Sequence, residues 1–310
     1  MRFSLSEHHK DRVAIAMLFV SPACFSTNMI IARAMADSFP PVAMAVARWG
    51  IVALLLGVWL WPQIARHHAV LRAEWKSLML LGGLGMGLCG APIYMAGAMT
   101  TATNIGLIYA VCPILVLLFG VYISSSNRLG VLQITGMLAG FIGVVAILTE
   151  GSLSRLFELA FNAGDLLVIL GTVAFALYSL GLKHIPTALP ALVRFGAMAC
   201  AGALWHLPFL VHEIAGRGLV VTPSWTHAGI VVLLVFVSSI GAYLSYGLIV
   251  SRLGAERAAL VLYISPLYNA AFAVLILSEQ IQSYHIMGTF LILGGLYLST
   301  GIARATDNQS

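Results

Sequence analysis

Two arginines lie well inside long apolar stretches of the chain. Arg48 is followed by Trp-Gly and Arg194 by Phe-Gly, and each stands a few residues after a proline. A guanidinium in such a place can bind a carboxylate through two parallel hydrogen bonds. Alternatively, its long stem can carry the charge to the polar surface or to the end of a neighbouring helix. At a rise of 1.5 Å per residue, each arginine would lie roughly 10–12 Å below the membrane surface. A long side chain can reach the surface from that depth, which favours the second interpretation.

Neutral polar and aromatic residues occupy similar apolar stretches, and together with the two arginines they form the candidate substrate-binding set. These residues are Asn28, Tyr94, Asn104, Tyr109, Tyr178, Tyr243, Tyr246, Tyr263 and Asn269. Aromatic walls that carry a few hydrogen-bonding groups suit a zwitterionic or partly apolar metabolite. Bonding between helices and belts at the membrane surface are the alternative uses of such residues. The sequence leaves both uses open.

The eleven Asp and Glu residues all fall in tails, in loops or at the ends of apolar stretches. An acidic residue in mid-membrane is expected of a proton relay or of a pump for cations. The sequence therefore favours neither of these functions. Transport without coupling, exchange, and coupling through a group that the sequence does not identify are the alternatives.

No motif for an enzyme, a metal site or a cofactor stands out. The four cysteines lie in apolar stretches without a CxxC spacing, and the His8-His9 and His67-His68 pairs lack spacing to further ligands. Sequences of the GxSxG, HExxH and Walker types are absent. We therefore expect no metal, no cofactor and no enzymatic activity, and an enzyme acting on lipid is disfavoured.

The candidate residues must be positioned by helices in a membrane. Of the 310 residues, 60% are hydrophobic and 9% are charged, whereas a soluble domain has about 25% charged residues. An all-α membrane protein is expected, and because a span needs about 20 apolar residues, we predict ten transmembrane helices. They cover residues 13–36, 40–61, 77–98, 101–123, 129–148, 164–183, 187–211, 225–250, 255–277 and 282–302.

The distribution of Lys and Arg orients the chain. With the N-terminus in the cytoplasm, ten basic residues fall in cytoplasmic segments and only Arg155 and Arg217 fall in outer loops. Positive charge gathers in the cytoplasmic loops of membrane proteins, so both termini are predicted to be cytoplasmic. Residues 1–12 and 303–310 are then cytoplasmic tails, and residues 149–163 are a periplasmic connector. The first apolar stretch is longer than the core of a signal peptide, and we expect it to remain as a span.

The second half of the chain repeats the first at an offset near 150 residues, so residues 13–148 and 164–302 are predicted to be two five-helix repeats. Pro113 corresponds to Pro266. Four glycines have the same internal spacing in the two halves: Gly136, Gly143, Gly288 and Gly295. Because five is odd, the two repeats are inverted, as in many secondary transporters. A proline inside a helix removes a backbone hydrogen bond, so Pro113 and Pro266 are the candidate hinges.

Several short stretches, taken in order, resemble those of one family. In the first half they are Asn28-Met29-Ile30-Ile31-Ala32-Arg33-Ala34, Phe39-Pro40-Pro41, Arg48-Trp49 and Thr101-Ala102-Thr103-Asn104. In the second half they are Gly164-Asp165-Leu166-Leu167, Leu253-Gly254-Ala255-Glu256-Arg257-Ala258, Pro266, Ser278-Glu279 and Gly288. From residue 13 to residue 302 the chain resembles the EamA-type family of ten-span carriers, in the drug/metabolite transporter superfamily. It departs from the family pattern at residues 124–127, which lack a carboxylate where the second half has Glu279.

The resemblance implies export of amino acids or other small metabolites across the bacterial inner membrane. Together with the repeat, it leads us to expect a secondary transporter that works by alternating access. The alternatives are a passive channel and a transporter for another metabolite class, such as a vitamin, a nucleoside or an amino-acid-derived metal chelator. The expected partners are a small-molecule substrate and the lipid bilayer, without nucleic acid, and a homodimer is left open.

Overall fold

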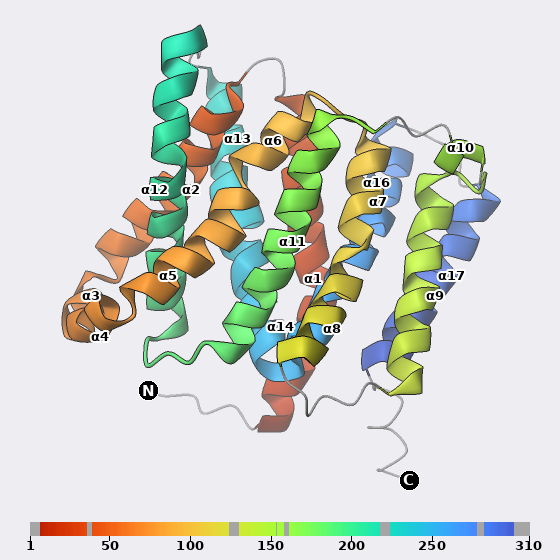
Figure 1. Cartoon of the computed structure of the whole chain (residues 1–310), viewed down its shortest axis with the longest axis horizontal. Helices are drawn as coiled ribbons and strands as arrows, with labels where there is room; N and C mark the ends of the chain where they lie inside the picture. The colour runs from red at the N-terminus through yellow and green to blue at the C-terminus, as the bar shows by residue number, and fades with distance from the viewer. Residues whose placement is uncertain are drawn as a thin grey trace.

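The computed structural model describes residues 7–35, 39–123, 130–152, 154–157, 161–217, 224–277 and 282–300. Within these ranges every regular element is a helix, and the long helices pack side by side (Figure 1). Eight helical segments of the described chain are long and apolar enough to cross a membrane. The all-α membrane fold is confirmed.

The helices of the first half include short pieces as well as long ones. They are α1 (Glu7–Ala34), α2 (Pro41–Trp59), α3 (Trp61–Arg66), α4 (His68–Ala73), α5 (Trp75–Gly82), η1 (Gly83–Leu88), α6 (Ala91–Gly97), α7 (Ala102–Ala110), α8 (Cys112–Ile123) and α9 (Val131–Leu148). The short α10 (Ser154–Phe157) follows. The second half comprises α11 (Ala163–His184), α12 (Ala191–Arg217), α13 (Trp225–Leu233), η2 (Leu234–Gly241), α14 (Ala242–Leu253), α15 (Ala255–Ala259), α16 (Val261–Leu277) and α17 (Ser283–Thr300).

Each predicted span coincides with a helical segment of the structure, although the number of ten spans stays a prediction. The eight that meet the length and hydropathy requirements end with α13–α14, and α16 and α17 are two further helices of 17 and 18 residues. The segment 62–76, which lies between two predicted spans, contains α3 and α4.

Helix α12 also extends beyond its predicted end at residue 211, through Pro208 and on to Arg217. The extension brings the end of α12 into contact with another helix. The carboxylate of Glu213 accepts hydrogen bonds from the backbone N–H groups of Val42 (3.2 Å) and Ala43 (2.9 Å) at the start of α2. These N–H groups have no partner within their own helix. The extended end of α12 therefore supplies hydrogen-bond acceptors to the first turn of α2.

The two halves interrupt their helices at corresponding places. The third span of each half contains a π-helical segment, η1 or η2, in which the usual backbone hydrogen-bond ladder is altered. The fourth span of each half is broken, at Val111 between α7 and α8 and at Leu260 between α15 and α16. The repeat is therefore visible in the irregularities of the helices as well as in the sequence.

Helices α9 and α17 show how the halves are related. A Cβ atom on Gly136 would lie 2.5 Å from the carbonyl oxygen of Gly295, and one on Gly143 would lie 2.8 Å from that of Gly288. The early glycine of each helix thus meets the late glycine of the other, so the helices are antiparallel and their contacts are reciprocal. Such reciprocal contacts are what a two-fold axis produces, and they confirm that the repeats are inverted. Small residues let the two backbones approach closely.

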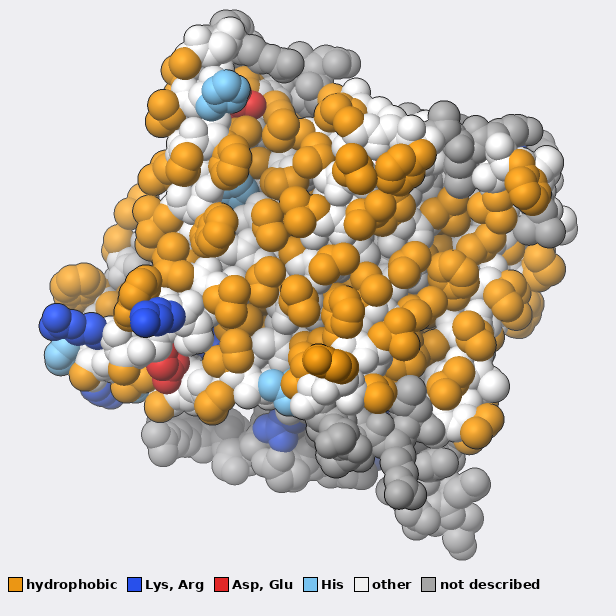
Figure 2. All heavy atoms as spheres, viewed as in Figure 1, with side chains coloured by type: hydrophobic (Ala, Val, Ile, Leu, Met, Phe, Trp, Pro, Cys, Tyr) orange, Lys and Arg blue, Asp and Glu red, His pale blue; other side chains and the backbone are white. Residues whose placement is uncertain are grey.

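The surface matches a lipid environment. Figure 2 shows apolar side chains over most of the visible face, and blue Lys and Arg atoms at the end of the molecule where Figure 1 places α3 and α4. Large apolar side chains that are more than half exposed include Val58, Trp59, Phe209 and Phe290. A soluble monomer rarely exposes apolar area on this scale, whereas a membrane protein turns it toward lipid.

Candidate functional site

A cavity of about 290 Å³ lies between the two repeats. Helices α1, α2, α6, α7 and α9 contribute to it from the first half, and α11, α14 and α16 contribute from the second half. Its volume is near the lower end of the range for small-molecule pockets, about 300–1,000 Å³. The cavity therefore suits a small metabolite.

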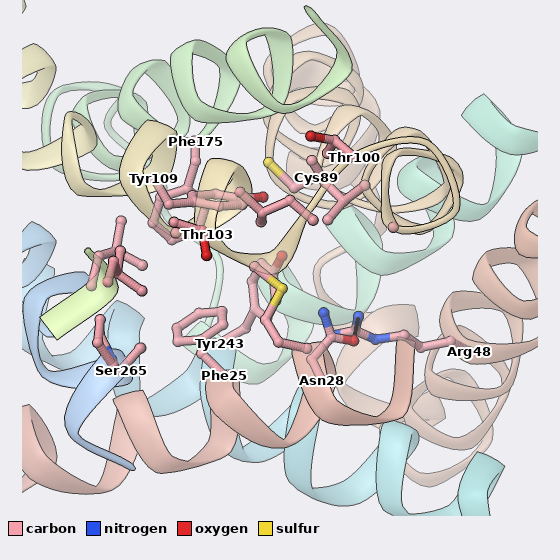
Figure 3. Close-up of a pocket in the computed structure, with 18 residues that line it drawn as sticks. Phe25, Asn28, Arg48, Cys89, Thr100, Thr103, Tyr109, Phe175, Tyr243 and Ser265 are labelled. Carbon is pink, nitrogen blue, oxygen red and sulfur yellow. Dashed lines mark hydrogen bonds between the residues drawn. The ribbon is translucent and has the colours of Figure 1, made fainter. Parts of the chain in front are cut away.

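Arg48 lies at one end of this cavity and is 2% exposed. Its Nη1 donates to Asn28 Oδ1 at 2.7 Å and to Tyr94 Oη at 2.8 Å. Its Nε donates to Ser239 Oγ and its Nη2 to the carbonyl of Ser238, both at 2.6 Å. Figure 3 shows Arg48 and Asn28 facing each other. The expectation that this arginine reaches the surface or a helix end is wrong.

The π-helical segment η2 explains why the arginine stays inside. In such a segment backbone carbonyls are displaced from their usual partners, and Ser238 and Ser239 of η2 supply two acceptors to Arg48. The guanidinium carbon also lies 4.5 Å from the ring centroid of Trp49, close enough for a cation–π interaction. The buried guanidinium therefore finds acceptors and an aromatic face without leaving the bundle.

All the hydrogen-bond acceptors that the described residues offer to Arg48 are neutral. Two ion pairs of the described residues join Arg155 to Glu150 and Lys183 to Glu256, and no carboxylate of the described residues pairs with Arg48. The cavity end thus carries a positive charge without a counter-charge from the described part of the chain. A buried charge of this kind is costly and attracts an anion.

Aromatic rings form much of the remaining wall. Phe25 and Phe175 meet edge to face with their centroids 5.8 Å apart, and Phe25 lies 5.5 Å from Tyr243. Tyr109 lines the cavity as well, and Figure 3 shows Ser265 at the end away from Arg48. Tyr243 is fixed because its hydroxyl donates to the carbonyl of Gly85, in η1, at 2.6 Å. Both π-helical segments therefore hold residues of the cavity.

Four of the predicted site residues line the cavity, and others surround it. The lining residues are Asn28, Arg48, Tyr109 and Tyr243. Tyr94 supports the lining, because its hydroxyl donates to Asn28 Oδ1 at 2.8 Å. Pro266, one candidate hinge, also lines the cavity. Pro113, the other, is buried in the first turn of α8.

The remaining predicted residues are not among those that line the cavity. Tyr178, Tyr246 and Tyr263 are buried in the bundle. Asn104 Nδ2 donates to the carboxylate of Asp165 at 3.1 and 3.2 Å. The backbone of Asn269 belongs to α16, but its side chain lies outside the part of the structure that is described.

Arg194 behaves differently from its repeat counterpart Arg48. Its Nη2 donates to the carbonyl of Ile185 at 3.1 Å and its Nη1 to that of Leu182 at 3.5 Å, both at the end of α11. Such carbonyls lack partners within their helix. The pairing with a helix end that the sequence suggested is therefore observed here, whereas Arg48 has a different environment.

Several lining residues were absent from the predicted set. Among them are Phe25, Thr100, Thr103, Phe175 and Ser265. Phe25 stands three residues before Asn28, so the two share one face of α1, and this spacing could have pointed to it. Thr100 and Thr103 lie around the turn between α6 and α7. Thr103 belongs to the stretch 101–104 that resembles the family, whereas nothing comparable in the sequence points to Thr100.

Polar contacts tie the helix ends together on the side where α1 begins. Lys183 Nζ, near the end of α11, lies 3.0 Å from both carboxylate oxygens of Glu256 in α15. About one turn further into the bundle, Ser179 Oγ and Tyr246 Oη are 2.6 Å apart. These two contacts join α11 to α15 and to α14 on this side of the bundle.

No group of three or more His, Cys, Asp or Glu residues that could hold a metal ion occurs among the described residues.

Two inverted repeats of membrane-spanning helices, with a cavity between them, define a multi-pass membrane transporter. The sequence profile of the EamA-like transporter family matches residues 12–149 and again residues 162–301. The chain therefore belongs to the EamA-like transporter family.

Two curated relatives agree with this assignment, and a solved structure has the same fold. The chain is similar to uncharacterized transporter YyaM of Bacillus subtilis (strain 168), with 24% identity over 270 residues that cover 86% of each chain. It is 26% identical, over 263 residues, to an uncharacterized transporter of Archaeoglobus fulgidus, covering 84% of this chain and 88% of the other. One crystal structure superposes with a TM-score of 0.72 at 19% identity, covering 97% of this chain and 100% of that chain. The last likeness concerns the fold alone.

Proposed function

We propose that the protein is a secondary transporter that exports amino acids or related small metabolites across the bacterial inner membrane. The observation that carries the proposal is the small cavity between the inverted repeats, with walls from both. In alternating access, the two repeats rearrange around such a site, so that it faces each side of the membrane in turn.

The position of the cavity supports an outward-facing state. Gly97, Thr100 and Leu148 line the cavity, and they lie at helix ends opposite the side where α1 begins. The contacts of Lys183 with Glu256 close the other side. With both termini in the cytoplasm, as the distribution of basic residues predicts, the closed side is cytoplasmic and the cavity lies nearer the periplasm.

Counterflow into reconstituted vesicles tests the proposal. Vesicles containing purified protein are preloaded with one unlabelled amino acid at a time, from a panel of all twenty, and uptake of the same labelled amino acid is measured. The proposal predicts saturable uptake above that of protein-free vesicles for at least one amino acid. Failure of the whole panel, with saturable counterflow of a vitamin, a nucleoside or a metal chelator instead, would reject amino acids while retaining transport.

A further inference from the structure

We propose that the substrate carries a carboxylate and that Arg48 binds it inside the cavity. This inference rests on the proposed function, because it names the chemical group by which the transported molecule is recognised. Arg48 is buried, borders the cavity and has only neutral acceptors among the described residues. A ligand that brings its own negative charge supplies the missing counter-charge.

The oxygen of Asn28 marks where a carboxylate oxygen would be bound. Two donors converge on this oxygen, because Arg48 Nη1 lies 2.7 Å away and Tyr94 Oη lies 2.8 Å away. Asn28 itself lines the cavity. A carboxylate that displaces the amide oxygen receives both hydrogen bonds, and its bond with the guanidinium becomes charge-assisted and therefore stronger.

The guanidinium also has a donor to spare. It carries five N–H groups, and its contacts with the described residues comprise four hydrogen bonds. Nε–H and the two Nη1–H groups account for three of these bonds, and one Nη2–H group accounts for the fourth. The remaining Nη2–H can bind the second carboxylate oxygen while Ser238 and Ser239 keep the guanidinium in place.

The rest of the cavity fits the remainder of such a molecule. Phe25, Tyr109 and Phe175 provide an apolar and aromatic wall. Arg48 is the one charged residue that lines the cavity within the described part of the chain. The site is therefore suited to a monocarboxylic acid with a small apolar body, and it discriminates against an uncharged molecule of the same shape.

Matched acids and amides test this inference. Binding of 4-methylpentanoate and 4-methylpentanamide, and of 3-phenylpropanoate and 3-phenylpropanamide, is measured on the purified full-length protein by isothermal titration calorimetry. We expect each acid to bind at least tenfold more tightly than its amide. Equal binding of acid and amide, or binding of neither acid, would overturn the proposal.

Two substitutions assign the effect to Arg48. Arg48→Gln removes the charge, and the preference for the acid should disappear. Asn28→Asp places a permanent carboxylate against the guanidinium, so it should weaken acid binding at least tenfold even if Arg48→Gln fails to fold. Gln63→Glu, on the exposed surface of α3, adds the same charge outside the cavity and should leave acid binding unchanged. Acid preference that survives Asn28→Asp contradicts the proposal.

The outcomes separate this inference from the proposed function. Acid binding that depends on Arg48, without counterflow of any substrate, would reject transport and leave the binding site standing. Counterflow by a protein that binds acids and amides equally would retain transport and reject the role of Arg48.

Discussion

Ser239 supports the charge of Arg48 at one end of the cavity. It accepts a hydrogen bond from Arg48 Nε at 2.6 Å and donates one to the carbonyl of Leu234 at 2.8 Å. Ser239→Ala should reduce the free energy of unfolding by about 1–3 kcal/mol, because a buried charged donor loses its acceptor. Thermal unfolding of the purified protein measures the change.

Ser251→Ala is the matched control for this prediction. Ser251 is exposed, and among the described residues its hydroxyl bonds to the carbonyl of Leu248 in its own helix, so the change should stay within about 0.5 kcal/mol. If both variants unfold at the same temperature, Ser239 contributes nothing particular to holding Arg48.

Only part of the environment of Arg48 could be predicted from the sequence. Its depth could be read from the position in α2, and Asn28 and Tyr94 could be recognised as candidates. The acceptors Ser238 and Ser239 lie about 190 residues further along the chain, and they are available because η2 is π-helical. Neither fact follows from local sequence, so the expected exit of Arg48 to the surface was wrong.

At the scale of elements, η1 allows a close approach of aromatic residues. A Cβ atom on Gly85 would lie 2.5 Å from the ring of Tyr178, which is fully buried. Gly85→Ala should therefore lower the free energy of unfolding by about 1–3 kcal/mol through overpacking. The unfolding temperature of the variant, measured in detergent, reports the change.

Gly57→Ala is a suitable comparison for Gly85→Ala. Gly57 lies in α2, and nothing lies within 4 Å of a Cβ added there. Because Ala favours a helix more than Gly does, this variant should be as stable as the original protein or more stable. A loss of stability equal to that of Gly85→Ala would mean that crowding at Tyr178 is not the cause.

The ion pair between α11 and α15 can be measured by exchanging its charges. Lys183→Glu places two carboxylates together and should destabilise the closed side, whereas the double variant Lys183→Glu with Glu256→Lys should recover much of the loss. Residues in contact usually couple by about 0.5–3 kcal/mol. A double-mutant cycle of unfolding free energies that shows no coupling would contradict a role for this pair in closing the bundle.

Much of the element order could be predicted, since long apolar stretches and repeated glycines are local properties of the sequence. The interruptions η1 and η2 could not, because apolar runs do not distinguish an α-helix from a π-helical segment. Helices α3 and α4 were missed for a related reason. They are short, have no buried residue, and so lack the apolar periodicity that predicts a helix.

For the whole molecule, the antiparallel contact of α9 and α17 fixes the relation between the repeats but leaves the orientation in the membrane as a prediction. Single cysteines, introduced into a cysteine-free variant of the protein, test the orientation in the membrane. Ser152→Cys, in the predicted periplasmic connector, should react with a membrane-impermeant maleimide in intact cells. Arg66→Cys, in α3, should react only after the membrane is permeabilised. The reverse pattern would place the termini in the periplasm.

The two repeats have the same fold, but residues at corresponding positions do not all have the same role. Arg48 and Arg194 have similar neighbours in sequence, yet one borders the cavity and the other caps the end of α11. The sequence pattern predicted the symmetry. Only the packing of the whole bundle shows which of the two arginines is available to a substrate.

Trans-stimulation tests whether the protein works by alternating access between the repeats. Vesicles are loaded with the labelled substrate that gives the strongest counterflow, and its efflux is timed with and without unlabelled substrate outside. A carrier that exchanges substrate reorients faster when it is loaded, so we expect external substrate to accelerate efflux severalfold. Efflux that is unchanged by external substrate, and that rises linearly with internal concentration, would indicate a passive channel and rule out alternating access.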